Sequence, residues 1–116
     1  MTERFVILRH DHPFLHWDLL LEEDTSARSW RLLRELCCGE PIAAEPLPPH
    51  RFLYLEYEGP VTGDRGTVRR VLSGSYTVVE SLAERIHVQF THNAVLASGR
   101  LQILSDGRQF WTFDAA

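Results

Sequence analysis

The stretch Phe14-Leu15-His16-Trp17-Asp18-Leu19-Leu20-Leu21-Glu22 decides how the whole sequence is interpreted. It predicts a β-strand, because apolar β-formers run without Gly or Pro between Pro13 and a polar turn at residues 22–24. Alternate side chains of a strand point to opposite faces, so the stretch divides into two sets. The set expected in the core is Leu15, Trp17, Leu19 and Leu21, and the other set is Phe14, His16, Asp18, Leu20 and Glu22.

The second set places an imidazole and a carboxylate side by side, because His16 and Asp18 are two residues apart on one face. His10 lies just upstream, before the bend implied by His12-Pro13, and can fold back toward the same point. Two imidazoles and one carboxylate suit a divalent transition metal with open coordination positions. The spacing leaves one alternative open, in which His16 and Asp18 form a hydrogen-bonded pair and His10 is a surface residue.

Length and composition describe one globular domain over residues 1–116. A hydrophobic content of 44% and a charged content of 24% are ordinary for a soluble protein. No apolar stretch approaches the roughly 18 residues of a membrane span, and the N-terminus does not have the shape of a signal peptide. The two cysteines, Cys37 and Cys38, are adjacent, so we expect no structural disulfide and a cytoplasmic location.

The net charge of -4 argues against a protein that wraps nucleic acid by charge alone. It does not argue against a protein that grips a single phosphate end. All 12 basic residues are arginine, the better bidentate donor to phosphate, although a GC-rich genome gives the same bias.

Short strands are expected at regular intervals along the chain. They are predicted over residues 4–10, 14–22, 27–34, 51–58, 67–72, 75–80, 84–90, 100–104 and 108–113. A helix over 27–36 competes with the third strand, and residues 91–98 are predicted as a loop. Four of the six prolines lie within residues 37–49, which therefore predict a surface loop and exclude a helix or a central strand. The pattern predicts an all-β, mostly antiparallel fold: a small closed or partly open β-barrel of about eight strands with little helix.

His50 and Tyr54 are further candidates, because they share one face of the strand predicted over 51–58. If this strand and the one over 14–22 line the same mouth of the barrel, both side chains converge on the metal ligands. His50 could then contact a phosphate oxygen or act as a general acid toward a leaving alkoxide. Tyr54 is either a site residue or a core aromatic with its hydroxyl hydrogen-bonded. The candidates to orient the histidines are Glu22, Glu56 and Tyr54.

The order of these residues resembles a known family. The pattern is His10-Asp11, Leu15-His16-Trp17-Asp18-Leu19-x-Leu21-Glu22, Ser29-Trp30, His50-x-x-x-Tyr54, Glu58-Gly59 and Gly66-Thr67-Val68. It resembles the 3′-phosphoesterase domain of bacterial DNA ligase D and the free-standing members of that family. The similarity runs from about residue 5 to about residue 80 and is weaker beyond.

The resemblance implies one compact β-barrel that binds Mn²⁺, with Zn²⁺ or Fe²⁺ as alternatives, and removes phosphates and ribonucleotides from 3′ ends during DNA repair. The implied partners are nucleic-acid 3′ ends and DNA end-joining proteins. Position by position, His10, His16 and Asp18 match the metal ligands of the family. His50 matches its phosphate-contacting histidine, and Tyr54 its active-site tyrosine.

The chain also departs from the family pattern. Leu20 stands two residues after the metal-binding aspartate, where the family has arginine, and Ile42 falls near a second arginine of the family. The family's lysine after Ser-Trp is matched best by Arg34, a candidate phosphate contact, and the turn over 60–66 is short. Loss of an arginine clamp can cost orders of magnitude in rate. Candidates to replace it are Arg9, Arg34 and Arg51.

Three functions follow as hypotheses. The first is a metal-dependent phosphoesterase acting on nucleic-acid 3′ ends. The second is a non-catalytic barrel that binds metal or nucleic-acid ends and has lost the clamp. The third is an Fe(II) oxygenase, because His16, Asp18 and His50 also fit the facial triad of those enzymes.

Overall fold

A computed structural model describes residues 3–116, in which nine β-strands and one 3₁₀ helix are connected by short turns. All pairings between the strands are antiparallel. The strands are β1 (Glu3–His10), β2 (His16–Glu22), β3 (Ala27–Leu32), β4 (Ile42–His50), β5 (Gly59–Pro60), β6 (Thr67–Ser81), β7 (Arg85–Thr91), β8 (Leu96–Ile103) and β9 (Gln109–Ala115), and the helix is η1 (Phe52–Leu55). The predicted all-β fold with little helix is confirmed. None of the helical structure in this range is long and apolar enough to cross a membrane.

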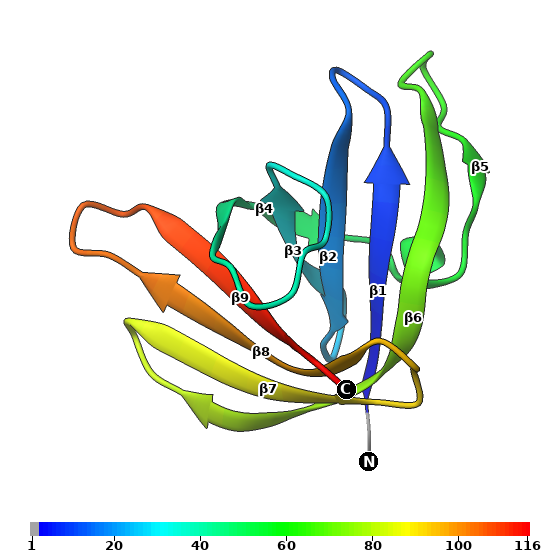
Figure 1. The fold of residues 1–116 in the computed structure, drawn as a ribbon. Helices are drawn as coiled ribbons and strands as arrows, with labels where there is room; N and C mark the ends of the chain where they lie inside the picture. Colours follow the sequence, from blue (N-terminus) through cyan, green and yellow to red (C-terminus); the bar gives the residue numbers. More distant parts are fainter. Residues whose placement is uncertain (1–2) are drawn as a thin grey trace.

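Eight of the strands form a ring in the order β1-β2-β3-β4-β9-β8-β7-β6, which closes because β6 also pairs with β1. β5 is attached to β6 outside the ring. The ring is not a regular barrel, because β6 changes partner along its 15 residues, from β1 to β7 near Ser75. As a result β1, β2 and β6 stand together, while β7, β8 and β9 run across their lower end (Figure 1).

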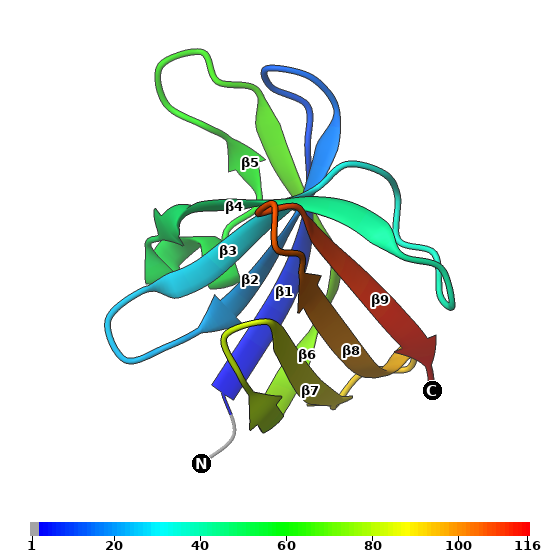
Figure 2. The same cartoon turned by 90° about the vertical axis from the view of Figure 1, so that its left-hand side faces the viewer.

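The ring has two hydrophobic clusters, one on each side of the β1–β2 wall. The larger cluster fills the inside of the ring with alternate residues from eight strands: Phe5, Ile7, Leu19, Leu21, Trp30, Leu32, Ile42, Ala44, Tyr76, Ile86, Val88, Phe90, Leu96, Leu101, Trp111 and Phe113. The smaller cluster lies on the outer face, where the segment 51–66 covers it: Val6, Leu8, Leu20, Ala27, Leu55, Val61 and Val68. Figure 2 shows η1 and β5 on one side of β1 and β2, with β7, β8 and β9 on the other.

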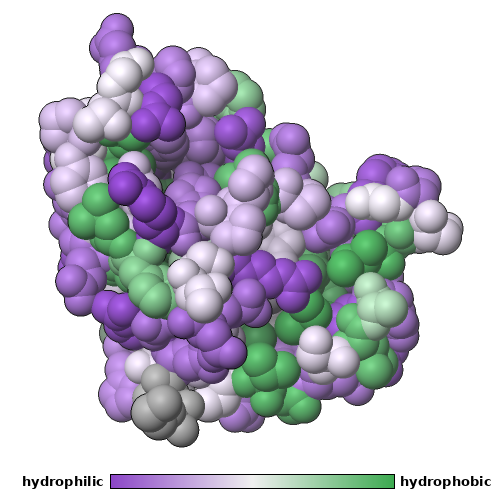
Figure 3. All heavy atoms as spheres, turned by 180° about the vertical axis from the view of Figure 1, so that it is seen from behind, coloured by the Kyte–Doolittle hydropathy of each residue, from purple (hydrophilic) through white to green (hydrophobic). Residues whose placement is uncertain are grey.

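β2 shows how the two clusters arise from one strand. Leu19 and Leu21 point into the ring, whereas Leu20 points outward and is also fully buried. Burying a leucine side chain contributes about 2 kcal/mol, so both faces of β2 stabilise the fold. Leu15, predicted in the core, is 45% exposed because the strand begins only at His16. Seen from behind, hydrophilic residues cover most of the surface and hydrophobic ones form separate patches (Figure 3).

The predicted surface loop over 37–49 is wrong for its second half, which is β4. β4 pairs with β3 and, through residues 42–44 only, with β9. Its three prolines, Pro46, Pro48 and Pro49, all follow this short pairing with β9. That half of β4 is an edge on its β9 side, and a proline on an edge costs the sheet no ladder hydrogen bond.

The strand predicted over 51–58 is also wrong, because residues 52–55 form η1. Backbone bonds from Tyr54 N–H to the Arg51 carbonyl and from Glu56 N–H to the Leu53 carbonyl close its turns. Leu55 is buried while Leu53 is half exposed, so these leucines do not share a buried strand face.

Other expectations need smaller adjustments. The strand alternative for residues 27–34 is confirmed as β3, and the helix alternative is wrong. The two strands predicted over 67–80 are one continuous strand, β6. The loop predicted over 91–98 shortens to residues 92–95, because β7 and β8 extend into it.

Candidate metal centre

The turn end of the β1–β2 hairpin, where residues 11–15 connect the two strands, brings three potential metal ligands together. His10 and His16 are direct cross-strand partners, and Asp18 lies opposite Leu8 one step further along the ladder. All three side chains occupy the outer face of the ring, and their ligand atoms lie within 4.8 Å of one another. His16 and Asp18 are almost completely buried. The group that strand alternation predicted therefore exists, although it lies on the outer wall of the ring and not in a barrel mouth.

The hydrogen bonds of the two imidazoles fix which nitrogen faces the centre. His16 Nδ1 lies 2.8 Å from the Phe14 carbonyl, and His10 Nε2 lies 2.8 Å from the Arg65 carbonyl. A carbonyl oxygen only accepts, so these nitrogens carry the protons in the neutral rings. The other nitrogens are left with lone pairs directed at the carboxylate. Metal-bound histidines are typically oriented in this way by a bond from the second nitrogen.

The remaining nitrogens face the Asp18 carboxylate. His16 Nε2 lies 3.3 Å from Asp18 Oδ1, and His10 Nδ1 lies 3.8 Å from Oδ2. Within residues 3–116, Asp18 Oδ1 is buried and has no hydrogen-bond partner. An unpartnered buried carboxylate oxygen is costly, and here two imidazole acceptors also face the carboxylate. This set of acceptors fits a divalent cation bound by His10, His16 and Asp18.

The turn between β5 and β6 supports the centre from one side. Its Arg65 carbonyl accepts the bond from His10, and Asp11 Oδ1 accepts a 2.7 Å bond from the Thr67 N–H. Gly66 makes this approach possible, because it has φ +77° and a Cβ there would lie 2.2 Å from Asp11 Oδ1. The Gly66 position is therefore tied to the orientation of His10.

A cavity of about 150 Å³ opens beside the carboxylate. Its lining residues are Leu8, His10, Asp18, His50, Tyr54, Val61, Arg65 and Val68. The structure thus brings His50, from the end of β4, and Tyr54, from η1, to the three potential metal ligands. His50 Nε2 lies 4.0 Å from Asp18 Oδ2, and the His50 and Tyr54 rings meet edge to face with centroids 5.7 Å apart. Burial lowers the pKa of His50 below its ordinary value, with the Asp18 carboxylate opposing the shift.

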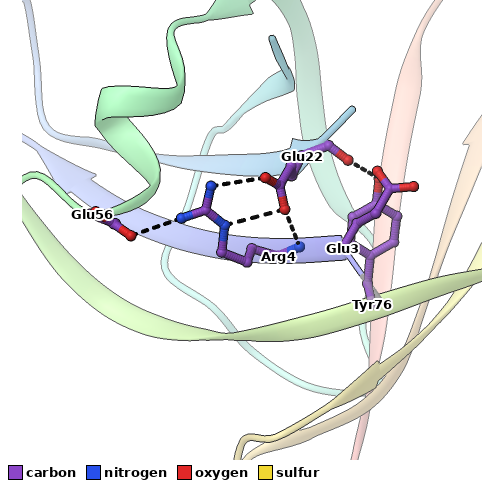
Figure 4. A network of polar contacts seen from close by, with 5 residues as sticks. All are labelled: Glu3, Arg4, Glu22, Glu56 and Tyr76. Atoms are coloured by element: carbon purple, nitrogen blue, oxygen red, sulfur yellow. Dashed lines mark hydrogen bonds and ion pairs between the residues drawn. The ribbon is translucent and has the colours of Figure 1, made fainter. Parts of the chain in front are cut away.

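Three predicted site residues lie elsewhere, and one of them, Glu56, accepts a hydrogen bond from Arg4 (Figure 4). Glu22, expected to orient a histidine, is at the far end of β2, where it binds Arg4 through both carboxylate oxygens (Figure 4). Glu22 is on the same face of β2 as Asp18, as strand alternation predicts, but the two residues are four positions apart, which is about 13 Å along an extended strand. Arg34, the candidate phosphate contact, binds Glu40 and the Pro41 carbonyl.

Several groups at the centre were missed by the sequence analysis. The carbonyls of Phe14 and Arg65 have no side-chain signature, so the residue pattern does not predict them. Asp11 and Gly66 were part of the family pattern, but their contact joins two distant turns. Leu20, at the position of the family's arginine, is fully buried in the outer cluster.

Comparison with family models and with curated proteins finds no match to this chain.

Proposed function

We propose that this protein is a metal-dependent phosphoesterase that acts on the 3′ ends of nucleic acid, with Mn²⁺ as its metal. One observation carries the proposal. His10, His16 and Asp18 direct unprotonated ligand atoms toward one point, and this point adjoins a cavity lined by His50 and Tyr54. The residue order that resembles the ligase D phosphoesterases supports the choice of substrate.

A divalent ion held by His10, His16 and Asp18 would supply Lewis-acid polarisation of a phosphoryl oxygen and activation of a water. The protein groups have separate tasks. In its protonated form, which the charge of a bound phosphate would favour, His50 would bind a phosphate oxygen, donate a proton to the leaving alkoxide and become the neutral imidazole. Tyr54 packs edge-on against the His50 ring and holds it over the cavity. Leu8, Val61 and Val68 form an apolar wall that limits access of water.

The test is a primer–template assay with Mn²⁺, one substrate carrying a 3′-phosphate and another a 3′-terminal ribonucleotide. We expect the wild type to release phosphate or the ribonucleotide, and His16→Ala to be inactive because it loses a metal ligand. His87→Ala is the matched control, because His87 is a half-buried histidine of β7 outside the cavity. A wild-type protein that holds Mn²⁺ and gives no product at high enzyme concentration would exclude the proposal.

The second candidate is a non-catalytic module that binds metal or nucleic-acid ends. The observation favouring it is Leu20, which is fully buried where the family has its arginine clamp. Tight binding of 3′-phosphorylated DNA without turnover, and unchanged by His50→Ala, would favour this module over the enzyme.

The third candidate is an Fe(II) oxygenase. The cluster of two histidines and one carboxylate has the composition of the facial triad. Its members are His10, His16 and Asp18, whereas the sequence suggested His50 in place of His10. His50 Nε2 lies 4.0 Å from the Asp18 carboxylate. Anaerobic loading with Fe²⁺ followed by exposure to oxygen distinguishes it, because an oxygenase consumes oxygen and a phosphoesterase does not.

A further inference from the structure

An arginine outside the predicted set lies next to the metal centre. Arg31 of β3 is the direct cross-strand partner of Asp18, so the two side chains leave the sheet on the same face. Leu20, at the position of the missing clamp, pairs with Ser29 on that same face. Arg31 therefore brings a positive charge to the outer wall beside the carboxylate.

The Arg31 guanidinium is held by an aromatic ring and not by an acid. Its central carbon lies 5.1 Å from the centre of the Phe14 ring, and the Phe14 ring lies 5.5 Å from the His16 ring. This cation–π contact fixes the guanidinium one ring away from a metal ligand. Phe14 is 50% exposed, so the contact is made at the surface of the centre.

Arg31 has unused hydrogen-bonding capacity. Its Nε is buried without a hydrogen-bond partner, and across the described chain no carboxylate lies within ion-pair distance of its guanidinium. Its other cross-strand neighbour is Glu45, yet these two do not pair. A half-buried guanidinium with unpaired donors is suited to an anionic ligand.

The other arginines near the centre have different roles. Arg65 lines the cavity, but its guanidinium bonds to Thr62 within the turn. Arg34 pairs with Glu40, and Arg9 lies on the opposite face of β1 from His10. The Arg51 guanidinium carbon lies 6.0 Å from the centre of the Tyr54 ring, which lines the cavity, so Arg51 is a rival for contact with a ligand there.

We infer that Arg31 binds the phosphoryl oxygens of the substrate, in place of the arginine that Leu20 replaces. This inference rests on the proposed function and adds the group that fixes the phosphate beside the metal ligands. The expected ligand is a phosphate ester with two free, negatively charged oxygens, because one guanidinium can bind both of them at once. The guanidinium would then come from β3, opposite Asp18, and not from the Leu20 position of β2.

The test measures binding and turnover separately. Thymidine 3′-monophosphate is titrated calorimetrically into Mn²⁺-loaded wild type and Arg31→Gln, and Mn²⁺ affinity is measured by electron paramagnetic resonance. Arg28→Gln is the matched control, because Arg28 also lies on β3 and stacks on an aromatic ring, Trp30, but on the opposite face. Arg51→Gln tests the rival, and Glu45→Gln tests a structural role for Arg31.

We expect Arg31→Gln to weaken nucleotide binding by roughly tenfold or more, with Mn²⁺ affinity and melting temperature unchanged. Arg31→Lys should recover part of the affinity, because lysine keeps the charge but not the bidentate geometry. Arg28→Gln and Glu45→Gln should bind as the wild type does.

Three results would overturn the inference, and the first two are a wild type that binds no nucleotide and an Arg31→Gln variant that binds as well as the wild type. A larger loss in Arg51→Gln than in Arg31→Gln would transfer the role to Arg51 and also overturn it. Nucleotide binding that depends on Arg31 without turnover of any 3′ end would leave the inference standing and remove the proposed function.

Discussion

The two ends of the β1–β2 hairpin each carry a polar cluster, and the clusters differ in how their charges are partnered. At the open end, away from the turn, Arg4 binds both oxygens of Glu22 and reaches Glu56 at 2.8 Å, while the Tyr76 hydroxyl donates to the Glu22 carbonyl (Figure 4). At the turn end, His10, His16 and Asp18 direct acceptor atoms toward one another. The groups of the first cluster are paired within the protein, whereas those of the second form a ligand set that could hold a metal ion.

This difference separates a structural network from a binding site on one pair of strands. Both clusters combine an acid with nitrogen groups. A titratable cluster is evidence for function only when its donors and acceptors do not satisfy one another. The following predictions test whether the two ends differ in this way.

The largest effect is expected for Asp18→Asn. The variant should lose at least about 100-fold in Mn²⁺ affinity, because it removes a charged ligand. At 100 times its Kd, Mn²⁺ should add about 2.7 kcal/mol to the unfolding free energy of the wild type and nothing to the variant. Without metal the variant should be at least as stable as the wild type, since one oxygen of the buried Asp18 carboxylate in the wild type has no hydrogen-bond partner. Thermal unfolding with and without Mn²⁺ measures both. A metal-free variant that is several kcal/mol less stable would show that the cluster at the turn end is a structural network.

Gly66→Ala should have the next largest effect, about 2 kcal/mol or more of stability, with weaker Mn²⁺ binding. Its Cβ would collide with Asp11 and His12 at 2.2 and 2.7 Å, and the turn that holds His10 would have to move. Gly63→Ala is the matched control, because Gly63 has the same φ of +77° and its nearest contact is at 3.6 Å. The control should lose about 1 kcal/mol from backbone strain alone. Equal losses of stability and metal affinity in the two variants would show that the turn does not position the centre.

Glu22→Gln should lower the unfolding free energy by about 1 kcal/mol, because it weakens a partly buried bidentate ion pair. Its Mn²⁺ affinity should equal that of the wild type. Glu80→Gln, which disrupts an exposed ion pair with Arg85, should be closer to neutral. Urea unfolding compares the stability of the two variants. A loss of Mn²⁺ affinity in Glu22→Gln would contradict the prediction, because it would show that the two ends of the hairpin depend on each other.

The smallest effect is the pH dependence of the Arg4–Glu22 pair at the open end of the hairpin. The hydrogen bond from Arg4 holds the pKa of Glu22 below its ordinary value of 4.5, with burial opposing the shift. The folded state therefore favours the ionised form, and this stabilisation is present above the ordinary pKa and is lost as the pH falls through the lowered one. The stability difference between wild type and Glu22→Gln should shrink from about pH 7 to about pH 3. A difference that grows on acidification would contradict the ion pair.

Local alternation in the sequence predicted more than its long-range features did. The alternation of side chains along a strand places His16 and Asp18 on one face. His10 joins them because β1 ends at His10, directly opposite the start of β2 at His16. Glu22 was misplaced because parity fixes the face of a residue and not its distance along the strand. Arg31 was overlooked because its neighbour across the sheet, Asp18, is fixed by the pairing register of β2 and β3.

β4 and η1 show why the remainder was not predicted. Prolines normally mark a loop, and those of β4 are tolerated only because its ladder with β9 ends at Ala44. That boundary depends on how far β9 extends, which nothing in residues 42–50 encodes. The helix η1 likewise depends on the outer cluster, where Leu55 packs against β1 and β2.

The short seam between β4 and β9 has a consequence for where the ring can open. Only three residue pairs join these strands, whereas six join β1 to β2. His50 lies at the other end of β4 and pairs with Ala27 of β3. Local opening of the ring at the seam would therefore part β4 from β9 and leave His50 bonded to β3, beside the hairpin that carries His10, His16 and Asp18.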